Sequence, residues 1–126
     1  MSQSKFSFLK RLHSFKYAFN GLKILLKEEH NSRIHLFATI VVLALGLFFK
    51  ISKGEWIAVI LAIGIVISME LINSAIESLA DFVSADRHPL IKKSKDLAAG
   101  AVLWAAICAF VVGSIIFLPK IWNLIF

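Results

Sequence analysis

The chain has 126 residues, 59% of them hydrophobic, and a mean hydropathy of +0.81. A soluble domain of this length could not bury so much apolar surface, so the composition excludes an ordinary soluble protein and indicates a membrane protein. The formal charge of +6 lies at the ends of apolar segments, which favours an anionic membrane surface or a phosphate substrate over nucleic acid.

The N-terminal segment, about residues 5–28, has the pattern of a basic amphipathic helix. Its apolar residues recur at spacings of three and four, while its lysines lie on other faces. By pattern alone, a helix on the membrane surface and a helix covering the protein's own core fit about equally well. The high total hydrophobicity favours the membrane surface. The apolar residues of this pattern are Phe8, Leu12, Phe15, Phe19, Leu22 and Leu26.

Three apolar segments follow, each predicted to cross the hydrocarbon core of a membrane, which is ~30 Å thick. The second is the longest, and at 1.5 Å per residue it reaches about 42 Å, so its final third must leave the hydrocarbon. Residues 50–55 link the first two segments, and a polar loop at 84–96, interrupted by Pro89, precedes the third. The predicted spans are about 31–49, 56–83 and 97–118.

The basic residues predict how these spans are oriented. Seven of the 14 Lys and Arg precede residue 36, and four more lie in the 84–96 loop. By the positive-inside rule, the N-terminus and this loop are cytoplasmic and the C-terminus faces outward. We therefore predict a multi-pass protein of the cell membrane. Its fold class is all-α, with three transmembrane helices and an amphipathic surface helix in a single domain over residues 1–126.

Ionisable side chains within a membrane span are costly, which makes them functional candidates. At 100° per residue, four polar residues of the second span fall within about 80° of arc and form one stripe along the helix. Glu70 lies about 21 Å from Trp56, still within the apolar slab, and Glu77 lies about 10 Å further, near the cytoplasmic interface. A solvated polar face remains an alternative for Asp81, the last residue of the stripe. The stripe comprises Glu70, Asn73, Glu77 and Asp81.

Two glutamates from different segments could hold Mg²⁺, a hard ion that takes oxygen ligands and keeps water and substrate phosphates around it. Glu29 ends the predicted surface helix at the level of Glu77, so it is the first candidate for a second ligand, although Glu28 could serve after a small rotation. A solvated Glu28 and Glu29 pair is the alternative. Charged residues at 86–88 and 95–96 lie at the same level and could seat a polyphosphate.

The chain contains neither a P-loop nor the motifs of protein kinases, so the residues alone predict only a membrane site with metal-binding potential. Three strings are more specific: ELINSAIE at 70–77, DRHPL at 86–90 and KDLAAGAV at 95–102. Tyr17, the Gly21 and Leu22 pair, and Glu29 precede them in the expected order. With these strings the chain resembles the bacterial diacylglycerol kinase family over nearly all of its length.

This resemblance implies an ATP- and Mg²⁺-dependent lipid kinase that transfers the γ-phosphate of ATP to the hydroxyl of a membrane lipid alcohol. It also implies a homotrimer whose active sites are shared between neighbouring subunits. Glu70 matches the general base that takes the proton from the lipid hydroxyl, with Asn73 beside it, and Glu29 and Glu77 match the metal ligands. A desolvated glutamate is a better base than an exposed one.

The resemblance also implies contacts to ATP and to the lipid. An arginine that is common near residue 10 in some members appears here only as Arg11, which leaves open whether Lys10 or Arg11 meets a phosphate. The implied ATP contacts are Lys10, Tyr17, Glu29, Glu77, Asp86, Arg87, His88, Lys95 and Asp96. The implied lipid contacts are Glu70, Asn73 and Ala99.

Two lipids, diacylglycerol and undecaprenol, fit a kinase of this kind, because each presents a primary hydroxyl at the interface. Segments 88–90 and 98–101, and His35, are closer to Gram-positive undecaprenol kinases, which favours undecaprenol. Two other classes of protein compete with a kinase. A small transporter or channel would use Glu70 as a coupling carboxylate. A structural subunit of a larger membrane complex would use the stripe as a hydrogen-bonding seam between helices.

Overall fold

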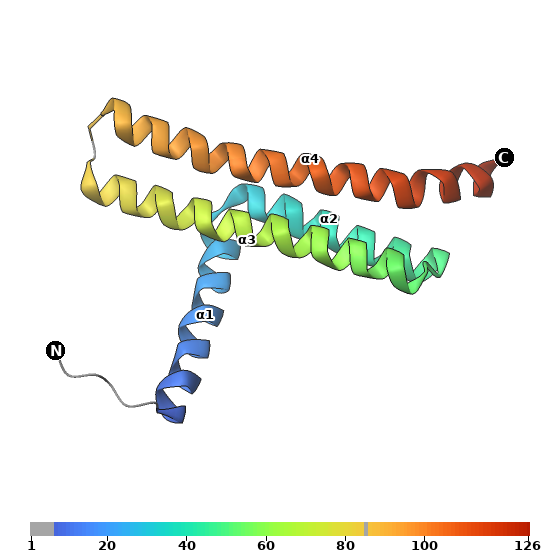
Figure 1. The fold of residues 1–126 in the computed structure, drawn as a ribbon, viewed down its shortest axis with the longest axis horizontal. Helices are drawn as coiled ribbons and strands as arrows, with labels where there is room; N and C mark the ends of the chain where they lie inside the picture. The colour runs from blue at the N-terminus through green and yellow to red at the C-terminus, as the bar shows by residue number, and fades with distance from the viewer. Residues whose placement is uncertain (1–6, 85) are drawn as a thin grey trace.

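A computed structural model describes residues 7–84 and 86–126, and it contains four helices (Figure 1). Three of them are long and apolar enough to cross a membrane, and the first is not. The predicted all-α fold with three spans and a separate N-terminal helix is confirmed, although the expected start of the first helix, at residues 5 and 6, lies outside the described residues. The helices are α1 (Phe8–Glu28), α2 (His30–Phe49), α3 (Lys53–Val83) and α4 (Pro89–Ile125).

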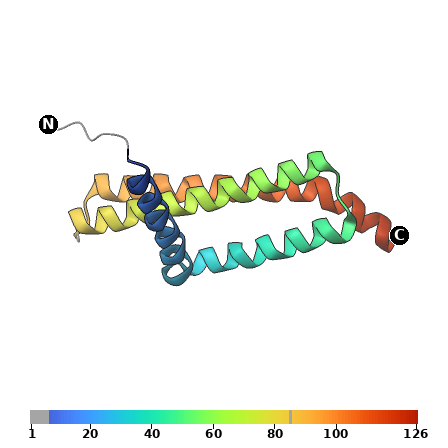
Figure 2. The ribbon, with the colours of Figure 1, turned by 90° about the horizontal axis from the view of Figure 1, so that it is seen from below.

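The frame of the molecule is an antiparallel hairpin of α3 and α4, which lie side by side along most of their length, with α2 running alongside the pair (Figures 1 and 2). The buried core gathers at the end where α2 joins α3. It is built on Ile51, Val59, Ile116 and Phe117. Because this core lies at one end, α2 is held most firmly near its C-terminus.

The link between α2 and α3 is shorter than the predicted 50–55 segment. Lys50 adopts a left-handed conformation, with φ of 50°, and ends α2. A reciprocal capping box then starts α3 at once: Glu55 N–H donates to Ser52 Oγ at 3.2 Å, and Ser52 N–H donates to Glu55 Oε1 at 3.0 Å. Gly46 of α2 allows Trp56 of α3 to pack closely against the helix, since a Cβ at residue 46 would lie 2.6 Å from Cη2 of Trp56.

The prediction of a polar loop over 84–96 is wrong for its second half, because α4 begins at Pro89. Proline fits the first turn of a helix, where its missing N–H has no intrahelical partner. His88 caps this end, with its Nδ1 accepting from the Leu90 N–H at 3.1 Å. At the other end α4 continues through Pro119 to Ile125, so the predicted span 97–118 lies inside a longer helix.

The first helix meets α2 at a sharp corner made by one extended residue, Glu29, and runs steeply away from the bundle (Figure 1). Arg33 stabilises the corner by donating to the carbonyls of Leu26 at 3.1 Å and Lys27 at 2.7 Å, two of the groups that a helix end leaves unpaired. Leu25 is the one buried residue of the described helix. The remaining apolar residues of α1 are exposed, which supports the membrane-surface interpretation over a cover for the protein's own core.

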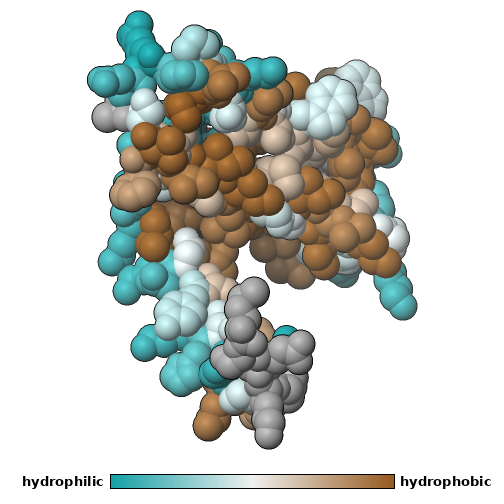
Figure 3. Space-filling model, turned by 60° about the vertical axis from the view of Figure 1, so that its left-hand side comes forward, coloured by the Kyte–Doolittle hydropathy of each residue, from teal (hydrophilic) through white to brown (hydrophobic). Residues whose placement is uncertain are grey.

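The flanks of the bundle are also apolar. Figure 3 shows hydrophobic side chains spread over the face of the bundle, with hydrophilic ones gathered toward its margins and on α1. In each of the three long helices, at most 17% of the most apolar window is buried within the chain. These flanks are therefore available to lipid or to neighbouring subunits.

Candidate active site

The polar stripe of α3 passes from a buried environment to an exposed one. Glu70 is 5% exposed. Asn73 and Glu77 are half-buried, and Asp81 is exposed. A buried carboxylate is costly unless it is paired or hydrogen-bonded, so Glu70 must have a partner. One helix therefore carries a buried carboxylate at Glu70 and, about three turns further on, an exposed one at Asp81.

The partner of Glu70 comes from α2. His35 Nδ1 forms an ion pair with Glu70 Oε1, and apart from this contact neither buried atom has a hydrogen-bond partner in the described chain. From the sequence, His35 indicates only the type of substrate and is not predicted to lie in the site. One feature of the sequence does point to the site: His35 is a titratable residue within an apolar segment, and such residues are functional candidates.

Asn73 adds an unpaired acceptor one turn from Glu70. Its Oδ1 is buried and has no hydrogen-bond partner within the described residues. Buried side-chain oxygens in folded proteins are nearly always paired, with protein or with ordered water. The Asn73 oxygen is thus free to accept from a substrate hydroxyl or from a metal-bound water.

Glu29 reaches the same stripe from the corner between α1 and α2. Its Oε1 accepts a hydrogen bond from Ser74 Oγ at 3.1 Å. Ser74 precedes Glu77 by three residues, and residues at that spacing are neighbours on a helix surface, about 5–6 Å apart at Cβ. Glu28, the last residue of α1, is exposed. Of the two candidates left open by spacing, the structure brings Glu29 to the stripe.

The oxygen donors near Ser74 fit a Mg²⁺ site that is completed by other ligands. Within the described part of the chain, no group of three or more His, Cys, Asp or Glu side chains is arranged to hold a metal. Mg²⁺ is usually held by one or two carboxylates together with waters and substrate phosphates. The carboxylates of Glu29 and Glu77 and the unpaired oxygen of Asn73 supply donors of this kind.

The N-terminal turns of α4 place basic residues beside the stripe. Lys95 Nζ lies 2.6 Å from Asp81 Oδ1, and Glu77 is within electrostatic range of the same ammonium group. On the next face of α4, Lys92 pairs with Asp96 at 2.6 Å. Exposed ion pairs of this type contribute little to stability, so a phosphate could displace either carboxylate at little cost.

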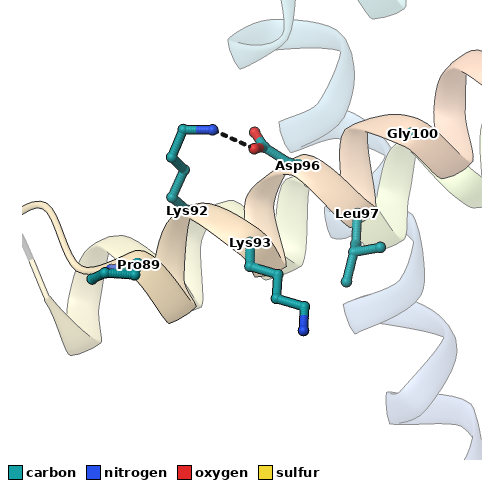
Figure 4. Close-up of a pocket in the computed structure, with 6 residues that line it drawn as sticks. All are labelled: Pro89, Lys92, Lys93, Asp96, Leu97 and Gly100. Carbon is teal, nitrogen blue, oxygen red and sulfur yellow. Dashed lines mark hydrogen bonds and ion pairs between the residues drawn. The ribbon is translucent and has the colours of Figure 1, made fainter.

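A shallow cavity of about 540 Å³ lies on the outer side of these turns (Figure 4). Figure 4 shows the Lys92 and Asp96 pair on one side of the helix and Lys93 extending the opposite way. The cavity is therefore bordered by two cations and one carboxylate, a charge balance suited to an anion. Its lining residues are Pro89, Lys92, Lys93, Asp96, Leu97 and Gly100.

The remaining predicted contacts are not brought to the carboxylates within this chain. Tyr17 is 72% exposed, and neither Lys10 nor Tyr17 makes a side-chain hydrogen bond or ion pair with α3 or α4 in the described residues. Residues 86–88 are exposed beyond the end of α3, where His88 caps α4. Ala99 is exposed on α4, next to the buried Ala98.

Comparison with known proteins identifies the family. The sequence profile of prokaryotic diacylglycerol kinase matches residues 16–117. The undecaprenol kinase of Bacillus subtilis is 40% identical over 108 residues, which cover 86% of this chain and 88% of that protein. The diacylglycerol kinase of Synechocystis is 37% identical over 114 residues, covering 90% and 65%. The diacylglycerol kinase of Haemophilus influenzae is 34% identical over 107 residues, covering 84% and 91%.

The family match covers α2, α3, most of α4 and every residue of the α3 stripe. It also makes the chain a multi-pass membrane enzyme of the lipid kinase class, in place of the transporter or structural subunit that the sequence left open. The chain belongs to the prokaryotic diacylglycerol kinase family.

Proposed function

We propose that the protein transfers the γ-phosphate of ATP to the hydroxyl of undecaprenol, with Mg²⁺ as the cofactor. The observation that carries the proposal is the stripe of α3, which has a buried carboxylate at one end and the Glu29 contact near the other. A lipid kinase needs both environments, because its lipid hydroxyl lies at the membrane and its nucleotide lies in water. The similarity to an undecaprenol kinase at 40% identity supports undecaprenol over diacylglycerol.

Glu70 is the proposed general base. Its carboxylate takes the proton of the lipid hydroxyl, and the lipid oxygen forms a bond to the γ-phosphorus. The bond from that phosphorus to the bridging oxygen breaks, and ADP leaves with the electron pair. Asn73, one turn away, donates from its side-chain amide N–H to the hydroxyl oxygen and orients it, which leaves the single hydroxyl proton to Glu70.

The other residues of the site neutralise charge. Glu29 and Glu77 would hold Mg²⁺, which when bound offsets the charge of the β- and γ-phosphates. The ammonium group of Lys95 leaves Asp81 and binds a phosphate oxygen instead, because its ion pair with Asp81 is exposed and weak. Residues 86–88 and Asp96 line the approach of the nucleotide from the cytoplasmic side. The basic N-terminal half of the chain supports this orientation, with the C-terminus outward.

We place Lys10 and Tyr17 in the site of a neighbouring subunit of a homotrimer. Within one chain, α1 leaves the bundle and carries both residues away from the stripe (Figure 1). Glu29, in contrast, contacts Ser74 of its own chain. Each proposed site thus combines the carboxylates of one subunit with the outer half of α1 from the next, which is a closed head-to-tail arrangement.

The substrate assignment predicts that undecaprenol is the better acceptor. In mixed micelles containing γ-labelled ATP and Mg²⁺, label should appear in undecaprenol with a higher kcat/KM than in diacylglycerol. A higher value for diacylglycerol would reverse the assignment of the lipid. Absence of label from both lipids would contradict a lipid alcohol as the acceptor.

The base assignment predicts that Glu70→Gln lowers kcat by about 10²-fold or more, because the amide keeps the size of the side chain but cannot take a proton. The KM for ATP should change little. Glu55→Gln is the matched control, since glutamine can replace glutamate in a capping box and Glu55 lies at the other end of α3. Full turnover by Glu70→Gln would exclude Glu70 as the base.

The metal assignment predicts that Glu29→Gln and Glu77→Gln each raise the Mg²⁺ concentration for half-maximal rate, by about tenfold or more, since each removes an anionic ligand. Glu28→Gln should leave the Mg²⁺ titration unchanged and is the matched control on the adjacent residue. Equal titrations for all three variants would show that these glutamates do not hold the ion.

The assembly predicts selective complementation between inactive variants. Mixing Glu70→Gln with the double variant Lys10→Met/Tyr17→Phe should restore activity at about one site in four, because random mixing pairs intact carboxylates with an intact neighbouring α1. Mixing Glu70→Gln with Glu29→Gln should restore none, since both residues belong to one chain's site. Recovery in the second mixture, or in neither, would contradict the proposed division of the site.

A further inference from the structure

The contact between His35 and Glu70 has no part in the proposed chemistry so far. His35 lies in α2, just after the polar first turn at residues 30–33, and from residue 34 to the end of the helix the only other polar residue is Thr39. Its side chain is 28% exposed, against 6% for the side chain of Glu70. Through this contact, a titratable side chain of one membrane helix meets the buried carboxylate of the next.

A carboxylate has only acceptor atoms, so a buried one depends on donors supplied by its surroundings. At Glu70, the contact to Oε1 comes from the imidazole alone, and that oxygen has no other partner in the described chain. The Nδ1–H of the imidazole supplies the donor. The contact occupies one carboxylate oxygen and leaves Oε2 for the lipid hydroxyl.

The contact also lies far from the core that holds α2 in place. The core that holds α2 lies near the α2–α3 link, about four helical turns from His35. An apolar cavity of about 460 Å³ lies between α2, α3 and α4 along this stretch. His35 is at the end of the cavity nearest Glu70, whereas Phe117 and Leu118 lie at the end nearest the core. The contact with His35 therefore joins α2 to α3 at the end of the cavity that lies far from the core.

We propose that His35 is a positioning residue: its Nδ1–H fixes the Glu70 carboxylate so that Oε2 faces the lipid hydroxyl. This inference rests on the proposed role of Glu70 as the base. The proton of the lipid hydroxyl still ends on Glu70, and the imidazole keeps its own proton throughout. His35 contributes orientation of the base, an effect that belongs to turnover rather than to substrate binding.

The test compares two substitutions of equal shape. Asparagine places an amide nitrogen where Nδ1 lies, and leucine has the same branching without a donor. His35→Leu should lower kcat by about tenfold or more, with the KM values for lipid and ATP unchanged, because a donor to a charged group is lost. His35→Asn should recover most of this loss. Thr39→Val, one turn further along α2 and on the same cavity, is the control and should retain full turnover.

A double variant separates positioning from packing. If His35 acts through the Glu70 carboxylate, His35→Leu should cost almost nothing further in a Glu70→Gln background. A packing role would lower the rate by the same factor in both backgrounds. Circular dichroism and gel filtration of all variants in detergent would verify that each retains its helices and its assembly.

Each other outcome overturns the proposal. Full turnover by His35→Leu would show that Glu70 needs no donor from α2, and an equal loss in His35→Leu and His35→Asn would assign the effect to the shape of the ring. A rise in the lipid KM with unchanged kcat would make His35 a binding residue. Failure of the base itself is distinguishable, because it would appear as full turnover in Glu70→Gln alone.

Discussion

A carboxylate inside the apolar part of a membrane helix is the constraint on which this molecule depends. Glu70 is buried, and a buried charge is tolerated only with partners. The partner, His35, lies on a different helix, so the same pair that satisfies the charge also joins the first half of α2 to α3. The pair thereby keeps a buried carboxylate, which is costly in a membrane, at one defined place.

The one-residue corner at Glu29 connects the membrane surface to this site. Because Arg33 pairs with the last carbonyls of α1, the chain can turn sharply without leaving those groups unpaired. The turn directs the Glu29 carboxylate to Ser74 on α3. A residue that ends a surface helix is thus placed beside a stripe more than 40 positions further along the chain.

The length of α3 and α4 brings lipid and nucleotide chemistry together. With 31 and 37 residues, these helices reach about 46 Å and 55 Å, well beyond a hydrocarbon core of ~30 Å. Their excess extends beyond the hydrocarbon core, and Asp81 of α3 pairs there with Lys95 of α4. A phosphate that displaced Asp81 would therefore lie about three helical turns from the buried carboxylate of Glu70.

The sequence by itself determined the helical class, the three spans and the polar stripe, since hydropathy and helical periodicity are local properties of the chain. It also contains the sequence motifs around Glu70 and Lys95 by which the chain resembles its family. It did not predict that residues 89–96 are helical, because a proline within a polar run reads as a break unless it occupies the first turn. Only the tertiary structure brought Glu29 into contact with Ser74 of α3 and paired His35 with Glu70. Both depend on contacts between helices, and the spacing of residues along one helix carries no information about which residue of another helix it meets.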